Sequence, residues 1–278
     1  MKEESGPPAM PDQPEPPWHS RINVMSVTLV AFLAAVAFSL PGIHGSGRDI
    51  DYLGNLLRFL SRFFPPDLSV LPMTLSNLLE TVRIAVVATA AAILISIPLA
   101  VAGARNISPF WLVVTTRMLL NGVRTVPSLI WALFAVAIVG ANPMAGVIAL
   151  TFYSIAYLGK FFADAFESLD SEVAQGMRAI GAGALQAVQF GFWPTAKPLV
   201  WSHSLWMLEY NIRSAAIIGI VGAGGIGVQL YGYADSRSWD KFATVLICIL
   251  VVVTVLDFTG EAIRRRITRK VTKPIAAE

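Results

Sequence analysis

Six long apolar segments constrain the fold of this chain more than any other feature. They lie near residues 22–43, 78–101, 118–141, 143–163, 198–221 and 242–262. A helix needs about 20 apolar residues to cross the hydrocarbon core of a bilayer, and each segment reaches about that length. Only 14% of the 278 residues are charged, whereas about a quarter are charged in a soluble domain. The sequence therefore predicts an all-α, polytopic membrane protein with about six transmembrane helices.

Basic residues are concentrated after the last apolar segment. The formal net charge is +3, and six basic residues crowd the C-terminal tail: Arg264, Arg265, Arg266, Arg269, Lys270 and Lys273. Basic residues next to a transmembrane helix are retained on the cytoplasmic side of the membrane. With six spans, both termini are then expected in the cytoplasm. The membrane, rather than nucleic acid, is the partner that this charge pattern indicates.

The N-terminal 20 residues differ from the rest of the chain. They contain six prolines among polar residues: Pro7, Pro8, Pro11, Pro14, Pro16 and Pro17. This composition predicts a disordered or polyproline tail. The apolar run that follows is interpreted as a retained helix and not a signal peptide, because the region before it is long and mixed in charge. The expected organisation is a cytoplasmic tail (1–20), a transmembrane domain (21–265) and a basic cytoplasmic tail (266–278).

Residues 50–64 have the pattern of an amphipathic helix. Apolar side chains recur at helical spacing at Leu53, Leu56, Leu57, Leu60 and Phe64, while Arg58 and Arg62 share another face. The pattern predicts a helix along the outer membrane surface that ends at Pro65 and Pro66. A loop helix packed against the spans is the alternative.

Three arginines belong to the second and third expected helices: Arg83, Arg117 and Arg124. Near helix ends such side chains can extend to the lipid headgroups. Arg124 is the deepest of the three, and Pro127 beside it would loosen the backbone. Arg124 is therefore a candidate for the lining of a polar pathway, with extension to the headgroups as the alternative.

The segment between the fourth and fifth spans, residues 164–197, is too polar to cross a membrane. Its apolar side chains form two helical faces, one with Val173, Met177 and Ile180 and one with Leu185, Val188 and Phe192, separated by Gly181 and Gly183. This predicts two short amphipathic helices that meet at a glycine turn in the cytoplasm. Such helices can dock into the groove of a partner. Packing against the chain's own helix ends is the alternative.

This segment resembles the cytoplasmic docking motif of bacterial ABC importer permeases. In that motif a Glu-Ala-Ala sequence precedes a glycine by three intervening residues, and a proline lies thirteen residues after the glycine. Gly181 and Pro194 have this separation, but the Glu-Ala-Ala positions fall on Gln175, Gly176 and Met177. The resemblance implies a coupling segment at 170–194 that contacts an ATPase subunit through Glu172, Gln175, Gly176, Arg178, Gly181, Ala182 and Pro194.

A second stretch is similar to permeases of phosphonate-type ABC importers. It comprises residues 209–215 (EYNIRSA), Gly219 and residues 222–227 (GAGGIG), and the stretches 64–67 and 80–98 are also similar. The resemblance covers about residues 50–265. It implies a homodimer of permeases, two cytoplasmic ATPase subunits that bind ATP and Mg, and an extracytoplasmic solute-binding protein.

Glu209 and Arg213 put opposite charges one helical turn apart in the fifth span. Near mid-membrane each would cost ~2.5–3.5 kcal/mol on insertion, and the i, i+4 spacing predicts that they pair with each other. They form either a structural ion pair or a pathway site, in which Arg213 faces a phosphonate-like anion and Asn211 and Glu209 adjust its strength. The candidate pathway residues are thus Glu209, Asn211, Arg213 and Arg124.

The glycines of residues 222–227 follow an apolar helix rather than a strand, which excludes a dinucleotide-binding loop. Gly222, Gly224, Gly225 and Gly227 would permit a sharp turn or reentrant backbone at the outer mouth. They could serve as a gate or allow close helix packing.

No pattern of an enzyme is present in the sequence. His19, His44 and His203 lack metal-ligand spacing, no acid orients His203 beside Ser204, and Cys248 is the single cysteine. No GxxxxGK[ST] motif occurs. Together with this absence, the resemblance to phosphonate-type permeases implies a transport subunit without its own cofactor, which moves phosphonate or a related oxyanion by alternating access. A permease for phosphite, phosphate or an amino acid, and a membrane-embedded lipid-phosphate enzyme, are the alternatives.

Overall fold

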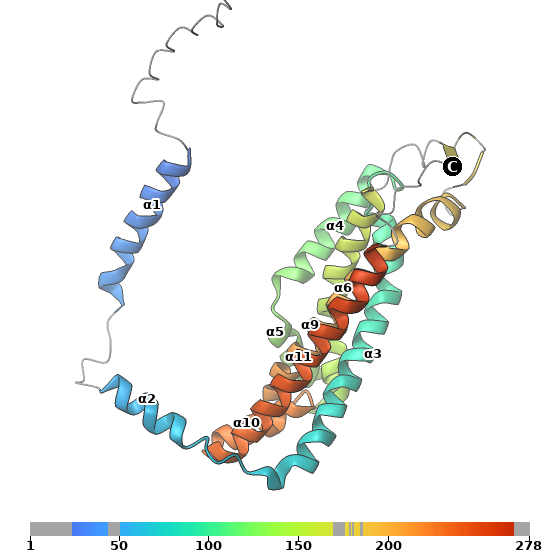
Figure 1. Ribbon diagram of the computed structural model, residues 1–278. Helices are drawn as coiled ribbons and strands as arrows, with labels where there is room; N and C mark the ends of the chain where they lie inside the picture. Colours follow the sequence, from blue (N-terminus) through green and yellow to red (C-terminus); the bar gives the residue numbers. More distant parts are fainter. Residues whose placement is uncertain are drawn as a thin grey trace, which may run out of the picture. The chain divides into compact units, whose positions relative to one another are not determined.

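The computed structural model describes residues 24–43, 51–168, 176–177, 179, 181–183 and 186–269. The tail expected at 1–20 lies outside these residues, and of the basic tail expected at 266–278 only residues 266–269 are described, at the end of the last helix. The chain divides into two units, Met1–Leu56 and Leu57–Glu278, which are considered separately. Every regular element within the described residues is a helix (Figure 1).

The first unit contains α1 (Val24–Ser39), the short 3-10 helix η2 (Leu40–Gly42) and the first half of α2 (Tyr52–Ser61). α1 is apolar on all sides and buries none of its residues within the chain. A helix with this composition is typical of a membrane span. The helix expected at 22–43 is therefore confirmed.

Five helical passes form the second unit. They are α3 (Leu71–Gly103), the bent pair α4 (Phe110–Thr125) and α5 (Ser128–Val139), α6 (Pro143–Glu167), α9 (Trp193–Ile218) and α11 (Trp239–Arg269). Of the described helices, α1, α3, α6 and α11 are each long and apolar enough to span a membrane, and counting each bent helix pair as one span brings the number to six. About six spans were expected, and this is confirmed.

The third span is broken. α4 and α5 meet at 87° across Val126 and Pro127. Proline has no N–H and disfavours helix in the residue before it, so α4 ends here. The Pro127 carbonyl then accepts hydrogen bonds from the N–H groups of Ile130 and Trp131 at the start of α5. The loosening expected beside Arg124 is thus a complete interruption of the helix.

The passes give the second unit two ends (Figure 1). The end that contains the start of α3, the end of α5 and the helix α10 (Ile226–Asp235) is named the glycine end. The end that contains the start of α4, the end of α6 and the start of α9 is named the docking end. α11 runs from the glycine end to the docking end.

Small residues let the central helices approach closely. Ala85, Ala88 and Ala92 of α3 and Ala145 and Ala149 of α6 are all fully buried. In a membrane, where lipid is as apolar as a leucine side chain, close packing of small residues is a main source of helix association. This packing fixes the positions of the polar groups described below.

The second half of α2 packs on a span. Phe59 and Phe63 lie against Trp239 at the start of α11, with ring centroids 4.9 and 5.9 Å from that of Trp239. α2 ends at Ser61, before the two prolines, as expected. Asp67 then caps the next turn, where hydrogen bonds from the Ser69 side chain and N–H hold the pKa of the Asp67 carboxyl below its usual value. This half of α2 therefore fits the alternative interpretation, a loop helix packed against the spans.

The second short helix expected at 185–192 is not separate from the fifth span. The π-helix η4 (Ala187–Phe192) runs directly into α9, and the Trp193 N–H donates to the Val188 carbonyl across the junction. Pro194 is the second residue of α9, directly after the π-helical turn, and the helix continues through it. The sequence prediction of two separate helices is therefore wrong on this side of the turn.

Candidate functional site

Glu209 and Arg213 of α9 each pair with a residue of α11. Arg213 Nη1 lies 3.1 Å from Asp257 Oδ2, and Arg264 Nη1 lies 3.2 Å from Glu209 Oε2. The expected pair between Glu209 and Arg213 is therefore wrong. α11 lies antiparallel beside α9 and presents an acid opposite the arginine and an arginine opposite the acid, so each charge is neutralised across the helix interface.

Glu209 is the more deeply buried of the two charges, with 8% of the residue exposed. Its Oε1 atom is buried and has no hydrogen-bond partner among the described residues. Gly260 of α11 makes room for this oxygen, because a Cβ atom on Gly260 would overlap with it. A buried carboxylate is stable only with a counter-charge, and Arg264 supplies it.

Asn211 is fully buried between three helices. Its amide nitrogen donates to Thr89 Oγ1 of α3 at 2.9 Å and to Ser154 Oγ of α6 at 2.8 Å. Asn211 therefore links α3, α6 and α9. The prediction that it adjusts Arg213 is not supported, because residues two apart on a helix face different directions and Arg213 faces α11.

Arg124 lies in the last turn of α4, beside the break in the third span. Its guanidinium carbon is 5.4 Å from the centre of the Tyr157 ring on α6. Arg117, Arg213 and Arg264 all form ion pairs, whereas none involves Arg124 in the part of the chain that the structure describes.

The turn expected at residues 222–227 is confirmed. The φ angles are +86° at Gly222, +81° at Gly224 and +73° at Gly225, a region that side-chain-bearing residues rarely adopt. The turn joins the 3-10 helix η5 (Gly219–Val221) to α10, which is bent by 48° from the preceding helix.

Gly219 and Gly227 bring the two sides of this turn into contact. A Cβ atom on Gly219 would lie 2.6 Å from the Gly227 Cα atom, and one on Gly227 would lie 2.8 Å from the Gly219 Cα atom. Such separations leave no room for a side chain. The geometry supports the close-packing interpretation, and a gating role for these glycines stays a prediction.

Two side chains of α3 bind the turn from the other side. The Gly225 N–H donates to Glu80 Oε1 at 3.0 Å, and the Ile226 N–H donates to Thr81 Oγ1 at 2.8 Å. These bonds satisfy N–H groups at the start of α10 that have no partner within the helix. Glu80 was not among the predicted site residues, although a carboxylate at the edge of an apolar segment is a signal that it has a partner.

A cavity of about 550 Å³ lies beside this turn, between α3 and α10. Its polar lining includes Asn77, Glu80, Gln229 and Tyr233. Asn77 Nδ2 donates to Gln229 Oε1, and Gln229 Nε2 donates to Thr74 Oγ1. The lining is neutral apart from Glu80, so it is suited to water or a small polar solute and not to the concentration of anions.

The glycine turn expected in the docking segment is confirmed at Gly181, where φ is +76°. The Ala182 N–H donates to the Met177 carbonyl, and the Gly183 N–H donates to Gln186 Oε1. A left-handed glycine followed by such a bond is a common way to end a helix.

The other expected docking residues are placed only in part. Gly176 is exposed and Pro194 lies in the first turn of α9. Glu172, Gln175 and Arg178 lie outside the described residues.

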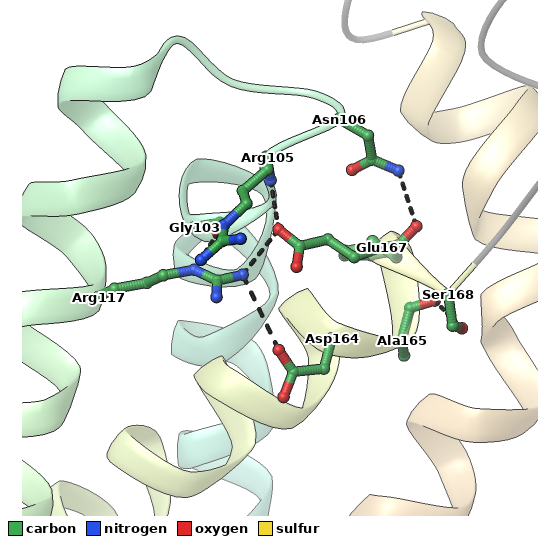
Figure 2. A network of polar contacts seen from close by, with 9 residues as sticks. Gly103, Arg105, Asn106, Arg117, Asp164, Ala165, Glu167 and Ser168 are labelled. Atoms are coloured by element: carbon green, nitrogen blue, oxygen red, sulfur yellow. Dashed lines mark hydrogen bonds and ion pairs between the residues drawn. The ribbon is translucent and has the colours of Figure 1, made fainter. Parts of the chain in front are cut away.

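A polar cluster joins the end of α6 to the loop between α3 and α4 (Figure 2). Arg117 Nη2 lies 2.7 Å from Glu167 Oε1 and 3.8 Å from Asp164 Oδ1, and its Nε atom donates to the Gly103 carbonyl. The backbone N–H of Arg105 donates to the same Glu167 carboxylate. Arg117 is thus held by the residues that lead into the docking segment. Its side chain does not extend to the lipid headgroups.

Across the ranges that the structure describes, no group of three or more His, Cys, Asp or Glu side chains is arranged to hold a metal ion. Cys248 is partly buried in an apolar cluster around Ile226 and Val245. His203 stacks on Phe161, with ring centroids 5.0 Å apart.

Residues 92–269 match the model of the family described as the binding-protein-dependent transport system inner membrane component. This chain belongs to that family. Its expected membership of the ABC importer permeases is confirmed, and the permease is a multi-pass membrane component of a transport system.

Relatives of the permease are similar along most of its length. It is 36% identical over 249 residues to the phosphite transport system permease protein PtxC of Stutzerimonas stutzeri, which covers 89% of this chain and 90% of that protein. It is 35% identical over 212 residues to the phosphate-import permease protein PhnE of Mycolicibacterium smegmatis, which covers 74% of this chain and 39% of that protein. These similarities confirm the resemblance to the phosphonate-type branch.

A solved structure has the same fold. A chain of the inward-facing MetNI methionine ABC transporter superposes with a TM-score of 0.65 at 23% identity, covering 71% of this chain and 97% of that chain. At this identity the similarity concerns the fold alone.

Proposed function

We propose that the permease is the membrane-spanning subunit of an ATP-driven importer that moves phosphonate or a related phosphorus oxyanion across the cytoplasmic membrane by alternating access. The observation that carries this proposal is the 36% identity to the phosphite permease PtxC over nine-tenths of both proteins. The similarity to a phosphate-import permease supports the same class of solute. Phosphite, phosphate and phosphonates share a tetrahedral phosphorus with several acceptor oxygens.

The complex would contain a second copy of the permease, two cytoplasmic ATPase subunits and an extracytoplasmic solute-binding protein. The dependence of the family on a binding protein supports the last of these. ATP and Mg would be held by the ATPase subunits, and this chain would bind no cofactor. The coupling segment 170–194 would contact the ATPase around the Gly181 turn, where Gly176 and Ala182 lie in the described part.

We assign the docking end and both termini to the cytoplasm. Arg105, Lys197 and the basic residues at the end of α11 lie near the docking end, which is the charge distribution of a cytoplasmic face. The glycine end, with the turn at 222–227, would then face outward.

The two ion pairs between α9 and α11 favour a structural role for Glu209 and Arg213. Both oxygens of Asp257 lie 3.1–3.2 Å from Arg213 Nη1, and Glu209 is held by Arg264. Removal of one partner of such a pair inside a bundle leaves an uncompensated charge. A pathway role for Arg213, the alternative, would use the exposed 44% of its side chain.

Reconstitution tests the proposal. Vesicles would contain the permease with its ATPase and binding protein, and uptake of phosphite, phosphate and methylphosphonate would be measured with ATP and with a non-hydrolysable analogue. We expect ATP-dependent uptake of at least one of the three. If the complex takes up an amino acid and none of the three oxyanions, the proposed substrate is wrong. Turnover of a lipid phosphate by the permease alone would indicate the enzyme instead.

A further inference from the structure

Six rings form one continuous surface on α6 and α9, here named the aromatic face. α6 contributes Tyr153, Tyr157 and Phe161, and α9 contributes His203, Trp206 and Tyr210. Spacings of three and four residues put each set on one side of its helix. Neighbouring ring centroids are 4.8 to 6.1 Å apart, so the rings touch from one end of the face to the other.

Three tyrosines lie side by side on the aromatic face. The Tyr153 ring lies between those of Tyr157 and Tyr210, at centroid distances of 4.8 and 5.2 Å. Tyr153 is buried, whereas Tyr157 and Tyr210 are partly exposed. Each hydroxyl can donate one hydrogen bond. A ligand on this face therefore meets several neutral donors within a small area.

Arg124 adds a positive charge at the same place, because its guanidinium lies over the Tyr157 ring. Within the described residues it forms no ion pair, unlike Arg117, Arg213 and Arg264. An arginine in a membrane-spanning segment without a counter-charge is costly, and such residues face the interior of a bundle or a water-filled cavity. The binding of an anion beside Arg124 would therefore supply the missing counter-charge.

This group lies deep in the permease. Arg124, Tyr153 and Tyr210 are 14 to 17 residues from the docking-end limits of α4, α6 and α9. At a rise of 1.5 Å per residue this is roughly 21–26 Å. The break in the third span ends α4 at this depth, so it holds Arg124 well inside and not at the surface.

Lipid is an unsuitable neighbour for the aromatic face. Hydroxyl and guanidinium groups at this depth need polar partners, which acyl chains do not offer. Other surfaces of the same helical bundle have the expected composition for lipid contact: Leu94 of α3 and Ile138 of α5 are 73% and 81% exposed. The aromatic face is therefore suited to an aqueous pathway between two copies of the permease.

We propose that Arg124 and the hydroxyls of Tyr153, Tyr157 and Tyr210 form the oxyanion-binding site of the transport pathway. This inference rests on the proposed function. A guanidinium binds two oxygens of a tetrahedral oxyanion, and the phenol hydroxyls donate to the remaining oxygens. One cation with neutral donors binds a dianion only weakly, and a transport site must release its ligand. Aromatic rings also bind quaternary ammonium ions, but Arg124 would repel them.

The first test is uptake by the complete complex, normalised to the amount of assembled permease. Arg124→Gln should lower oxyanion uptake about ten- to hundredfold, which corresponds to the loss of a charge-assisted contact. Tyr157→Phe keeps the ring and removes the hydroxyl, and it should lower uptake by a smaller factor. Arg265→Gln is the matched control, because it removes an equal charge from a side chain that is 74% exposed on the docking side of α11. Normal uptake by Arg124→Gln would overturn the site while the proposed function stands.

The second test measures access and occupancy directly. In a Cys248→Ala background, Tyr157→Cys should react with a membrane-impermeant thiol reagent, and phosphite or phosphate should slow the reaction. Leu94→Cys, on a lipid-facing surface, should not react. A Tyr157→Cys that is inert, or is not protected by either anion although the unsubstituted complex transports them, overturns the site. If the unsubstituted complex transports none of phosphite, phosphate and methylphosphonate, the proposed function fails first, and with it the ligand named here. If it transports methylphosphonate alone, methylphosphonate is the protecting anion in this test.

Discussion

Asn211, Glu209 and Glu80 have in common that another helix supplies their partners. Asn211 bonds to α3 and α6, Glu209 to α11, and Glu80 to the backbone of the glycine turn. A membrane offers no water to an unpaired group, so each of these contacts fixes the position of one helix against another. The same reasoning makes Arg124 unusual, since its neighbours are aromatic rings rather than a carboxylate.

An exchange of charges tests the structural role of the pair between Arg213 and Asp257. Arg213→Asp puts two acids together, so we expect less assembled permease in detergent, measured by gel filtration. The double variant Arg213→Asp with Asp257→Arg restores opposite charges and should recover most of the yield. Because both side chains are 44% exposed in the isolated permease, we expect a partial and not a complete loss of assembled protein.

The opposite result has a clear meaning. If Arg213→Ala assembles normally and loses oxyanion uptake, Arg213 belongs to the pathway and the structural interpretation is wrong.

At the scale of elements, two glycine turns shape the permease differently. Gly181 needs its φ angle, but a Cβ atom added to it would meet nothing within 4 Å. Gly227 has an ordinary φ angle, but a Cβ atom added to it would overlap with the Ala216 carbonyl and Gly219. The first turn is limited by backbone conformation and the second by packing.

Gly181→Val should therefore uncouple ATP hydrolysis from uptake, because a β-branched residue disfavours a positive φ and would redirect the docking segment. The ratio of solute transported to ATP hydrolysed measures the effect. Gly181→Asn should keep more of the coupling, since asparagine tolerates the left-handed region. Gly232→Ala on α10 is the control, because Gly232 has open space and no positive φ and lies outside the docking segment. Unchanged coupling in Gly181→Val would contradict the docking assignment.

Gly227→Ala should destabilise the packing of α10 against the end of α9 by about 1–3 kcal/mol, the usual range for an overfilled contact. Thermal unfolding in detergent would report this as a lower midpoint. Gly232→Ala on the same helix has nothing within 4 Å of the added atom and should be neutral. Equal midpoints for the two variants would show that the turn can relax.

The elements also show what the sequence could predict. Length and apolarity were enough to locate the spans, and Pro127 and Gly181 marked the break and the turn, because these features act through local backbone chemistry. The partner of Glu209 could not be predicted in this way. The i, i+4 rule describes an isolated helix, whereas here α11 lies beside α9 and provides Arg264. The aromatic face was missed because its members are far apart in sequence.

At the scale of the whole permease, the two ends of the second unit differ in chemistry. The glycine end has the amides Asn77 and Gln229 beside a backbone turn, and the docking end has the ion-pair cluster around Arg117. Loop arginine and lysine residues set the orientation of a membrane protein, while acids contribute little. The aromatic face lies between the ends, at the depth expected of a site that opens to each side in turn.

This polarity gives a prediction on orientation. In a Cys248→Ala background, Asp235→Cys at the exposed end of α10 should react with an impermeant thiol reagent added outside intact cells, and Ser168→Cys at the exposed end of α6 should react only in inside-out vesicles. The reason is that α6 and α10 end at opposite ends of the bundle, and the basic residues lie near the end of α6.

The two positions control for each other, since both are exposed helix ends. Reaction of both from the same side would contradict the five-pass arrangement, and reaction with the sides exchanged would put the docking segment where no cytoplasmic ATPase could reach it.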